Sequence, residues 1–155
     1  MPGTPNIAVY PPALSVAAPL LAVALEWAVP LGLLPAAGSG VILLPGLGVL
    51  AGAGVLAWTG VRAFQAAETN VDPRQPALAL VHSGPYRVTR NPMYLGMVLV
   101  QLGLALTFSL DWALFGAGVV WTLLHACVVL PEEAYLTDRF GDAYRAYLAS
   151  TRRWL

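Results

Sequence analysis

Residues 82–96 read HSGPYRVTRNPMYLG, a polar stretch in a chain that is otherwise strongly apolar. Two arginines, two tyrosines and a histidine stand here directly before a new hydrophobic run. Pro85 and Pro92 fix their own φ angles and disfavour helical geometry at the residues before them. The whole connection, from about residue 65 to 92, is several times longer than two helices need, and such loops are usually functional or disordered. We therefore predict that this stretch forms the wall of a site.

The composition is that of a membrane protein. Of the 155 residues, 58% are hydrophobic and 10% are charged, whereas soluble domains carry about 25% charged residues. The length suits one compact helical bundle, so we predict a single domain over residues 1–155. The first ten residues lack the positive charge of a signal peptide, so we expect the first hydrophobic segment to be retained.

The residue types give no indication of a metal site or of a nucleic-acid partner. Cys127 is the only cysteine, which excludes an intramolecular disulfide and argues against a thiolate cluster. His82 and His125 lack partners at a metal-binding spacing. The formal net charge is zero. Serine-protease order, HExxH, CxxC and Walker patterns are all missing from the sequence.

Four hydrophobic runs are long enough to cross a bilayer, which takes roughly 20 residues as a helix. We predict an all-α integral membrane fold with four transmembrane helices, at about residues 13–34, 41–64, 93–110 and 112–130. The tight turn near residue 110 makes the last two helices a hairpin. A cytoplasmic loop follows the second helix, and residues 131–150 are expected to form a helical cap.

The arginines predict the orientation of the bundle. All eight basic residues are arginines, none precedes Arg62, and they lie either around the long connection or after the fourth span. An even number of spans places these two regions on one side, which the positive-inside rule makes cytoplasmic. We therefore expect a multi-pass protein with both termini in the cytoplasm. Three or five spans would divide the arginines across the membrane.

The tail has an acidic first turn and one apolar face. Glu132 and Glu133 follow Pro131 directly, as suits the start of a helix. Apolar residues then recur at helical spacing: Leu136, Phe140, Tyr144, Tyr147 and Leu148. Such a tail could lie on the membrane surface, anchored by the basic and aromatic residues 152–154. It could also cap the long loop, and the two arrangements are compatible.

Two features within the predicted spans have more than one interpretation. Gly48 and Gly52 form a small-xxx-small pair, which favours close helix packing over a ligand role. Glu26 is an ionisable group within a span, where such groups are costly. With Pro30 following, it could line a substrate groove, or it could lie near the interface or against a neighbour. The sequence leaves these possibilities open.

Few side chains remain as candidates for chemistry. Trp121, His125 and Glu132 fall on roughly one face of a regular helix. For His125 alone, an interhelical hydrogen bond is favoured over catalysis. Glu132 and Glu133 are adjacent and point in different directions, so at most one is expected to face a buried ligand. The residues alone thus predict a cytoplasm-facing pocket for a polar cofactor or headgroup.

Residues 79–96 resemble the signature of integral-membrane methyltransferases, the superfamily of isoprenylcysteine carboxyl methyltransferases and phospholipid N-methyltransferases. The second half of that signature is present as well: Pro131-Glu132-Glu133, then Leu136, Phe140-Gly141, Tyr144, Tyr147 and Arg153. The two motifs stand at the expected separation and cover about half of the chain. The first two predicted helices carry no resemblance beyond their hydrophobicity.

The resemblance implies a cytoplasmic pocket for S-adenosylmethionine. Carried over by position, the cofactor-binding residues are Leu78, Ala79, Leu80, Val81, Tyr86, Asn91, Pro92, Met93, Tyr94 and Glu132, with Gly96 allowing close approach of the third helix. Loop backbone, tyrosine faces and one carboxylate suit the amino acid, ribose and adenine of this cofactor. Methyl transfer then requires alignment of donor and acceptor and exclusion of water. A lipid or lipophilic acceptor is expected to enter laterally between the helices.

Two departures from the signature bear on the acceptor. Asn91 stands where many members have histidine, and it cannot act as an acid or base. Val128 stands where the carboxyl methyltransferases have an arginine that holds the substrate carboxylate, which weakens the prenylcysteine interpretation. Arg87 or Arg90 could substitute for that arginine.

The acceptor thus stays open between carboxylate, amine and thiol. Phospholipid amine methylation needs a base to take the ammonium proton, for which Glu133, Glu132 and His125 are candidates. Arg90, Glu133 and His125 are accordingly the predicted catalytic residues. A non-catalytic membrane protein that keeps the fold is the remaining alternative.

Overall fold

The computed structural model describes residues 3–155, and this part of the chain is helical without any β-strand. The α-helices are α1 (Pro11–Ala28), α2 (Gly40–Ala66), α3 (Pro92–Phe108), α4 (Asp111–Leu124), α5 (Leu130–Phe140) and α6 (Asp142–Ser150). A short 3-10 helix, η1 (Gly84–Arg87), precedes α3. A π-helical turn, η2 (His125–Val129), joins α4 to α5 without a break. The all-helical prediction is confirmed.

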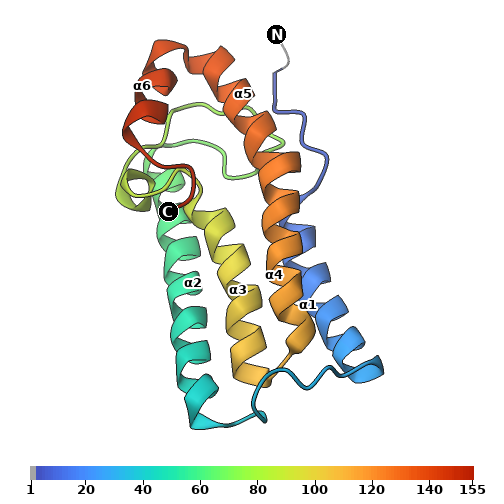
Figure 1. The fold of residues 1–155 in the computed structure, drawn as a ribbon. Helices are drawn as coiled ribbons and strands as arrows, with labels where there is room; N and C mark the ends of the chain where they lie inside the picture. The colour runs from blue at the N-terminus through green and yellow to red at the C-terminus, as the bar shows by residue number, and fades with distance from the viewer. Residues whose placement is uncertain (1–2) are drawn as a thin grey trace.

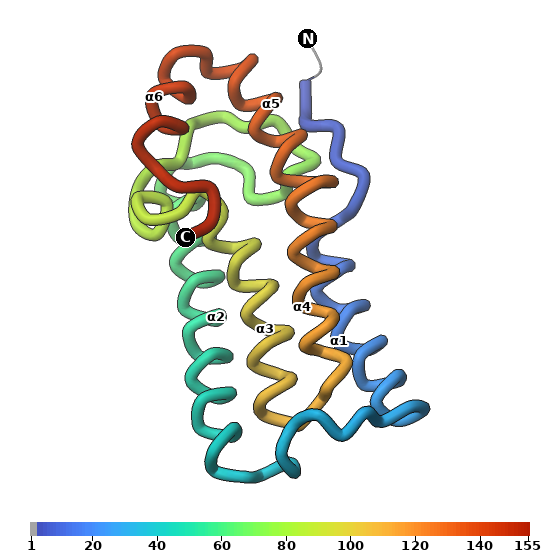
Figure 2. The backbone as a smooth tube through the Cα atoms, viewed as in Figure 1, coloured from blue at the N-terminus to red at the C-terminus, as the bar shows by residue number. Residues whose placement is uncertain are grey.

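The long helices lie side by side in the order α2, α3, α4, α1 (Figure 1). α3 packs against both α2 and α4, and α1 packs mainly on α4. α1 and α2 are consecutive in the chain, yet they lie at opposite edges of the bundle. The loop between them, residues 29–39, crosses one end of the bundle, as the tube in Figure 2 shows. The turn between α3 and α4 lies at this same end, whereas residues 67–91, α5 and α6 lie at the opposite end (Figure 1).

Within residues 3–155, three helical segments are long and apolar enough to cross a membrane: α1, α2 and the continuous 30-residue segment Asp111–Phe140. α3 is apolar but has 17 residues, fewer than the roughly 20 of a typical span. The first helix ends at Ala28, earlier than the predicted residue 34. Pro30 explains this end, because it disfavours helical geometry at Val29 and lacks an N–H of its own.

Asp111 ties the loop between α1 and α2 to the turn between α3 and α4. Its carboxylate is buried and accepts hydrogen bonds from the backbone N–H groups of Leu33 (2.8 Å) and Leu34 (2.9 Å). The Ser109 hydroxyl donates to the carbonyl of Pro35 at 2.7 Å. These side chains thereby supply hydrogen-bond partners to backbone groups of a loop that belongs to no helix or sheet.

Glu26 lies at this same end, at the start of α4. Its carboxylate accepts a hydrogen bond from the backbone N–H of Trp112 (3.3 Å), and the Trp112 indole donates to the carbonyl of Val29 (2.8 Å). A carboxylate beside the first N–H groups of a helix interacts favourably with the helix dipole. Of the interpretations left open, the structure therefore shows Glu26 against a neighbouring helix end.

Glycines allow α2 and α3 to approach closely, but not the predicted pair. A Cβ atom at Gly46 would lie 2.6 Å from the backbone nitrogen of Thr107, and one at Gly96 would lie 3.1 Å from the carbonyl oxygen of Ala53. A Cβ at Gly48 or Gly52 would meet nothing within 4 Å among the described residues. The prediction of close packing at Gly48 and Gly52 is therefore wrong. Gly96, which the resemblance assigned to the cofactor site, allows α3 to approach α2 closely.

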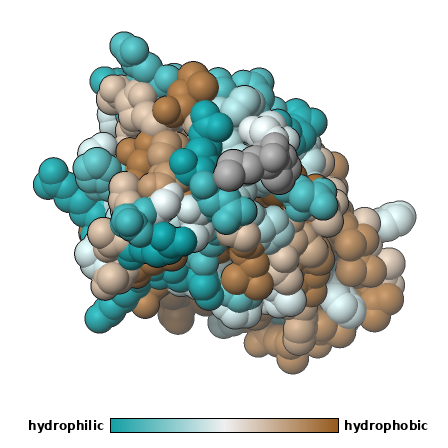
Figure 3. Space-filling model, turned by 90° about the horizontal axis from the view of Figure 1, so that it is seen from above, coloured by the Kyte–Doolittle hydropathy of each residue, from teal (hydrophilic) through white to brown (hydrophobic). Residues whose placement is uncertain are grey.

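The end of the bundle that carries α5, α6 and residues 67–91 is polar. Figure 3 looks onto this end and shows hydrophilic residues spread across it, interrupted by smaller hydrophobic patches, with a larger hydrophobic area at one side. The motifs identified in the sequence all lie at this end (Figure 1). It is here that a cavity forms.

Candidate functional site

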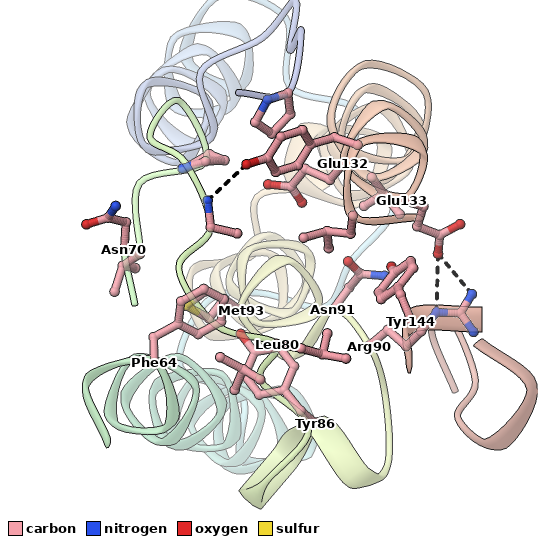
Figure 4. A pocket seen from close by; sticks show the side chains of 18 of the residues that line it. Phe64, Asn70, Leu80, Tyr86, Arg90, Asn91, Met93, Glu132, Glu133 and Tyr144 are labelled. Atoms are coloured by element: carbon pink, nitrogen blue, oxygen red, sulfur yellow. Dashed lines mark hydrogen bonds and ion pairs between the residues drawn. The ribbon is translucent and has the colours of Figure 1, made fainter. Parts of the chain in front are cut away.

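A cavity opens between the long loop, the start of α3 and the helices α5 and α6 (Figure 4). The empty space between these elements is about 830 Å³, a value that includes the part open to solvent. Its polar and aromatic lining comes from Phe64, Asn70, Asp72, Gln75, Tyr86, Arg90, Asn91, Tyr94, Glu132, Glu133, Tyr135, Tyr144 and Tyr147. The apolar lining includes Ala79, Leu80, Val81 and Met93.

The long loop is held in place by side chains that bind its backbone. The Thr69 hydroxyl accepts hydrogen bonds from the N–H groups of Leu78 (2.8 Å) and Ala79 (3.2 Å). The Asn70 amide donates to the carbonyl of Pro76 (2.9 Å). The Tyr135 hydroxyl accepts the N–H of Ala77 (3.1 Å) and so ties the loop to α5. Because these groups are satisfied, irregular backbone can form a wall of the cavity.

Aromatic rings form another wall. The Tyr86 ring is buried and lies 5.4 Å from that of Phe64 between centroids. Burial raises the pKa of Tyr86 far above its ordinary value, so its hydroxyl stays neutral. The Tyr147 hydroxyl donates to the carbonyl of Tyr86 at 2.7 Å, and burial raises its pKa to about 12. α6 is thereby fixed to the loop.

Glu132 points into the cavity (Figure 4). Its carboxylate accepts a hydrogen bond from the Tyr94 hydroxyl at 2.8 Å. Within residues 3–155, no basic side chain lies within ion-pair distance of it. A carboxylate turned into a cavity without a cationic partner favours binding of a positively charged group.

Glu133 points the other way, toward the guanidinium of Arg90 (Figure 4). It forms ion pairs with Arg90 (2.9 Å) and with Arg153 (2.7 Å). Arg90 also donates to the carbonyls of Leu148 and Thr151. Hydrogen bonds to Glu133 raise the pKa of Arg153 above its ordinary value. Both arginines and Glu133 are therefore engaged with one another and with the tail.

The C-terminal segment lies beside residues 89–91. The backbone N–H of Arg90 donates to the carbonyl of Arg152 (2.9 Å). The Thr89 hydroxyl (3.1 Å) and the Asn91 amide (2.9 Å) both donate to the carbonyl of Arg153. Of the two arrangements predicted for the tail, the structure thus shows the cap over the loop.

His125 lies outside the cavity. Its ring stacks on that of Trp121, with centroids 5.3 Å apart and planes at 7°, and it accepts a hydrogen bond from the Trp154 indole (3.3 Å). The π-helical turn begins at His125 and inserts an extra residue into the helix. The regular spacing that placed His125 and Glu132 on one face therefore does not hold.

The structure brings ten of the predicted site residues together around the cavity and leaves four outside it. Those that line it are Ala79, Leu80, Val81, Tyr86, Arg90, Asn91, Met93, Tyr94, Glu132 and Glu133. Leu78 is 60% exposed. Pro92 is buried at the start of α3. Gly96 packs against α2, and His125 contacts the two tryptophans.

Sequence reasoning missed the polar residues before the motif. Asn70, Asp72 and Gln75 line the cavity, and the Arg74 guanidinium beside Asp72 (2.8 Å) lowers the pKa of that carboxyl. Three polar side chains within six residues of a long loop could have indicated them. Tyr144 and Tyr147 stood in the quoted motif, and their spacing of three on one helix could have placed them together.

The N-terminal segment also contributes, and no pattern predicted it. Pro5 lines the cavity, and the Tyr135 hydroxyl donates to the carbonyl of Gly3 (3.2 Å). The N–H of Ala8 donates to the carbonyl of Cys127 (3.2 Å), in the π-helical turn. A short segment before α1 thus braces both the cavity and the turn that precedes α5.

Comparison with known proteins agrees with this geometry. Residues 41–143 match the family described as phospholipid methyltransferase, and that match covers more than half of the chain. The chain belongs to the phospholipid methyltransferase family. With its three long apolar helices, it is an integral membrane protein. The resemblance found in the sequence is thereby confirmed.

A curated relative is similar over a shorter region. It is an uncharacterized protein of Haemophilus influenzae (strain ATCC 51907 / DSM 11121 / KW20 / Rd), 35% identical over 63 residues. The aligned region is 41% of this chain and 100% of the relative. No solved structure matches the chain.

Proposed function

We propose that this protein transfers a methyl group from S-adenosylmethionine to a lipid or lipophilic acceptor at the membrane interface. The observation that supports this most is the meeting of both family motifs at one cavity. Glu132 of the second motif reaches Tyr94 of the first across that cavity. A carboxylate that lines a cavity without a basic partner is costly and brings no evident benefit to a purely structural protein.

The lining suits each part of the cofactor. Tyr86 and Phe64 offer ring faces for the adenine. Asn70, Asp72 and Gln75 offer acceptors and donors for ribose hydroxyls and the amino acid group. Glu132 offers negative charge to a sulfonium or ammonium group. When bound, the cofactor supplies a methyl group on a positively charged sulfur.

The contribution of the protein to the reaction is alignment and exclusion of water. α6 closes one side through Tyr147 and Tyr86, and the Glu133–Arg90–Arg153 cluster holds the tail in place. Restricting donor and acceptor to an in-line geometry accelerates such displacements. The Tyr94 hydroxyl fixes the orientation of Glu132, which keeps the negative charge directed into the cavity.

The charges around the cavity favour an amine acceptor over a carboxylate. Arg90 is engaged with Glu133 and with backbone carbonyls, so it is not free to hold a substrate carboxylate. Val128 is fully buried and packs with Leu124 and with two residues that line the cavity, Tyr94 and Val129. It therefore presents an apolar side chain behind the cavity wall, where a buried substrate carboxylate would find no cationic partner. Phospholipid amine methylation is accordingly the second, more specific proposal, with Glu132 as the candidate base.

We propose further that the cavity and both termini face the cytoplasm, across four spans. The arginines gather at the end of the bundle that holds the cavity. In a Cys127→Ala background, Gln75→Cys is expected to react with a membrane-impermeant maleimide only after the membrane is opened. Labelling of intact cells would contradict the orientation.

Calorimetric titration of S-adenosylmethionine into the detergent-solubilised protein tests the proposed function directly. We expect binding to the unmodified protein and weaker binding to Tyr94→Phe, which removes the hydroxyl that orients Glu132. Tyr10→Phe serves as a control at a tyrosine outside the cavity lining. Transfer of labelled methyl from the cofactor to phosphatidylethanolamine, but not to a prenylcysteine analogue, would support the amine acceptor. Lack of cofactor binding by the unmodified protein would overturn the proposal.

A further inference from the structure

A second, shallow groove lies on the outer side of the tail, apart from the cavity. It is lined by Arg87, Val88, Ser150, Thr151, Arg152 and Leu155. The backbone pairing of Thr89 with Arg152 brings the loop and the tail together here. Both guanidinium groups of the groove come from segments that are 60 or more positions apart in the chain, so the fold assembles them.

The two arginines of this groove differ from those of the cavity. Arg90 and Arg153 are held by Glu133. Arg87 and Arg152 are exposed, and within the described residues 3–155 neither side chain forms an ion pair or a hydrogen bond. The residues that line the groove include these two arginines and no aspartate or glutamate among residues 3–155. Two unpartnered arginines that line one groove are suited to a phosphate, which a guanidinium group binds in a bidentate way.

Apolar side chains stand beside this charge. Val88 is 66% exposed and Leu155 is 76% exposed. Ser150 and Thr151 line the same groove. The Ser150 hydroxyl donates to the carbonyl of Tyr147 (3.2 Å), which leaves the Thr151 hydroxyl as the donor for a phosphate oxygen. A phosphate next to glycerol and acyl chains presents this combination of charge and hydrocarbon, whereas a free phosphate ion does not.

The groove lies at the border between the apolar helices and the polar end. The N–H of Arg90, the residue before the start of α3, donates to the carbonyl of Arg152. η1, which contributes Arg87, packs against the last turns of α2. Figure 1 shows η1 and the C-terminus at the level where α2 ends and α3 begins. Headgroups of the surrounding bilayer reach a protein surface at this level.

From these observations we infer that the groove of Arg87 and Arg152 binds the phosphate of an anionic membrane lipid. The lipid lies at the outer surface of the protein, with its glycerol and acyl chains against Val88 and Leu155. This binding is independent of methyl transfer, because the groove and the cavity have separate linings. It fixes the tail, and with it the cap, to the membrane surface.

The test is native mass spectrometry of the protein in detergent with phosphatidylglycerol or phosphatidylcholine. We expect the unmodified protein to retain phosphatidylglycerol preferentially. Removing Arg87 and Arg152 together, as R87Q/R152Q, should weaken that retention about five-fold for each arginine. The matched variant R62Q/R139Q removes the same charge from exposed arginines outside the groove and should change retention little.

Each other outcome would overturn the inference. Equal retention of the two lipids would exclude a headgroup site, and equal loss in the matched variant would show an effect of net charge alone. Displacement of phosphatidylglycerol by inorganic phosphate at similar concentration would indicate a free-phosphate site. Thermal unfolding of both double variants controls for folding, and both should match the unmodified protein because the substituted side chains are exposed. Cofactor binding by R87Q/R152Q separates this result from the proposed function.

Discussion

The acidic residues at the two ends of the bundle differ in the partners that their carboxylates have. At the end with the loop of residues 29–39, Glu26 and Asp111 both accept hydrogen bonds from backbone N–H groups, and together they join three segments of chain. At the cavity end, Glu133 is paired twice with arginine, but Glu132 has only the Tyr94 hydroxyl. A carboxylate with saturated partners stabilises a fold, whereas one left with free acceptor capacity is available to a ligand. The contrast therefore separates structural acids from a binding acid.

The largest effect is expected at the end of the bundle that carries the loop of residues 29–39. Replacing the buried Asp111 by alanine removes the acceptor of the N–H groups of Leu33 and Leu34, whose hydrogen bonds are partly buried. We expect the free energy of unfolding to fall by about 3 kcal/mol. Denaturation in mixed micelles measures this, with the exposed Asp138→Ala as control. Equal stability of the two variants would contradict a structural role for Asp111.

The second-largest effect is expected at the cavity end. It concerns the affinity for the cofactor rather than the free energy of unfolding. Glu132→Gln keeps the size of the side chain and removes its charge. Loss of a charge-assisted contact costs roughly 1.5–3 kcal/mol, so the affinity for S-adenosylmethionine should fall about ten- to a hundred-fold. Stability should stay the same, because Glu132 has no basic partner to lose. Unchanged cofactor affinity would remove Glu132 from the site.

Glu133 lies next to Glu132 in the chain, but its carboxylate is paired with arginines, so we expect its substitution to affect stability. Glu133→Gln leaves Arg90 and Arg153 without their shared carboxylate, and Arg153 is partly exposed, so we expect a loss of stability of about 2 kcal/mol. The consequence should be faster hydrogen exchange in residues 150–154, measured by mass spectrometry. Protection as in the unmodified protein would show that the backbone contacts of the tail suffice without this cluster.

The smallest effect is expected at Glu26. Its hydrogen bond to Trp112 is long, at 3.3 Å, and its interaction with the start of α4 is worth about 0.3–1 kcal/mol. Glu26→Gln should lower the unfolding temperature slightly and leave cofactor affinity unchanged. A marked loss of methyl transfer by this variant would instead place Glu26 in the path of the acceptor.

Hydrophobicity was sufficient to predict the helical fold, because runs of apolar residues long enough to span a bilayer can hardly form anything else. The helix ends were less predictable. A hydropathy pattern continues through Pro30, and only the backbone chemistry of proline ends α1 at Ala28. The side on which the cavity lies in the membrane stays a prediction from the arginines.

The two motifs predicted most of the cavity wall, since they meet across it through Tyr94 and Glu132. Contacts that depend on tertiary packing could not be predicted. The sequence does not show whether Arg90 pairs with Glu133 or binds a substrate, because either role is compatible with an arginine at that position of the motif. Asn70 and Pro5 enter the cavity through loop paths that have no periodicity.

The π-helical turn at residues 125–129 determines which side chains of α5 face the cavity. One inserted residue turns everything that follows by about 100° about the helix axis, while the axis itself continues. In a regular helix, Glu132 would stand where Glu133 stands now, beside the arginines, and Pro131 would face the cavity. Whether a carboxylate or a proline faces the cavity is therefore set by the winding of a turn that itself meets the cavity at Val129.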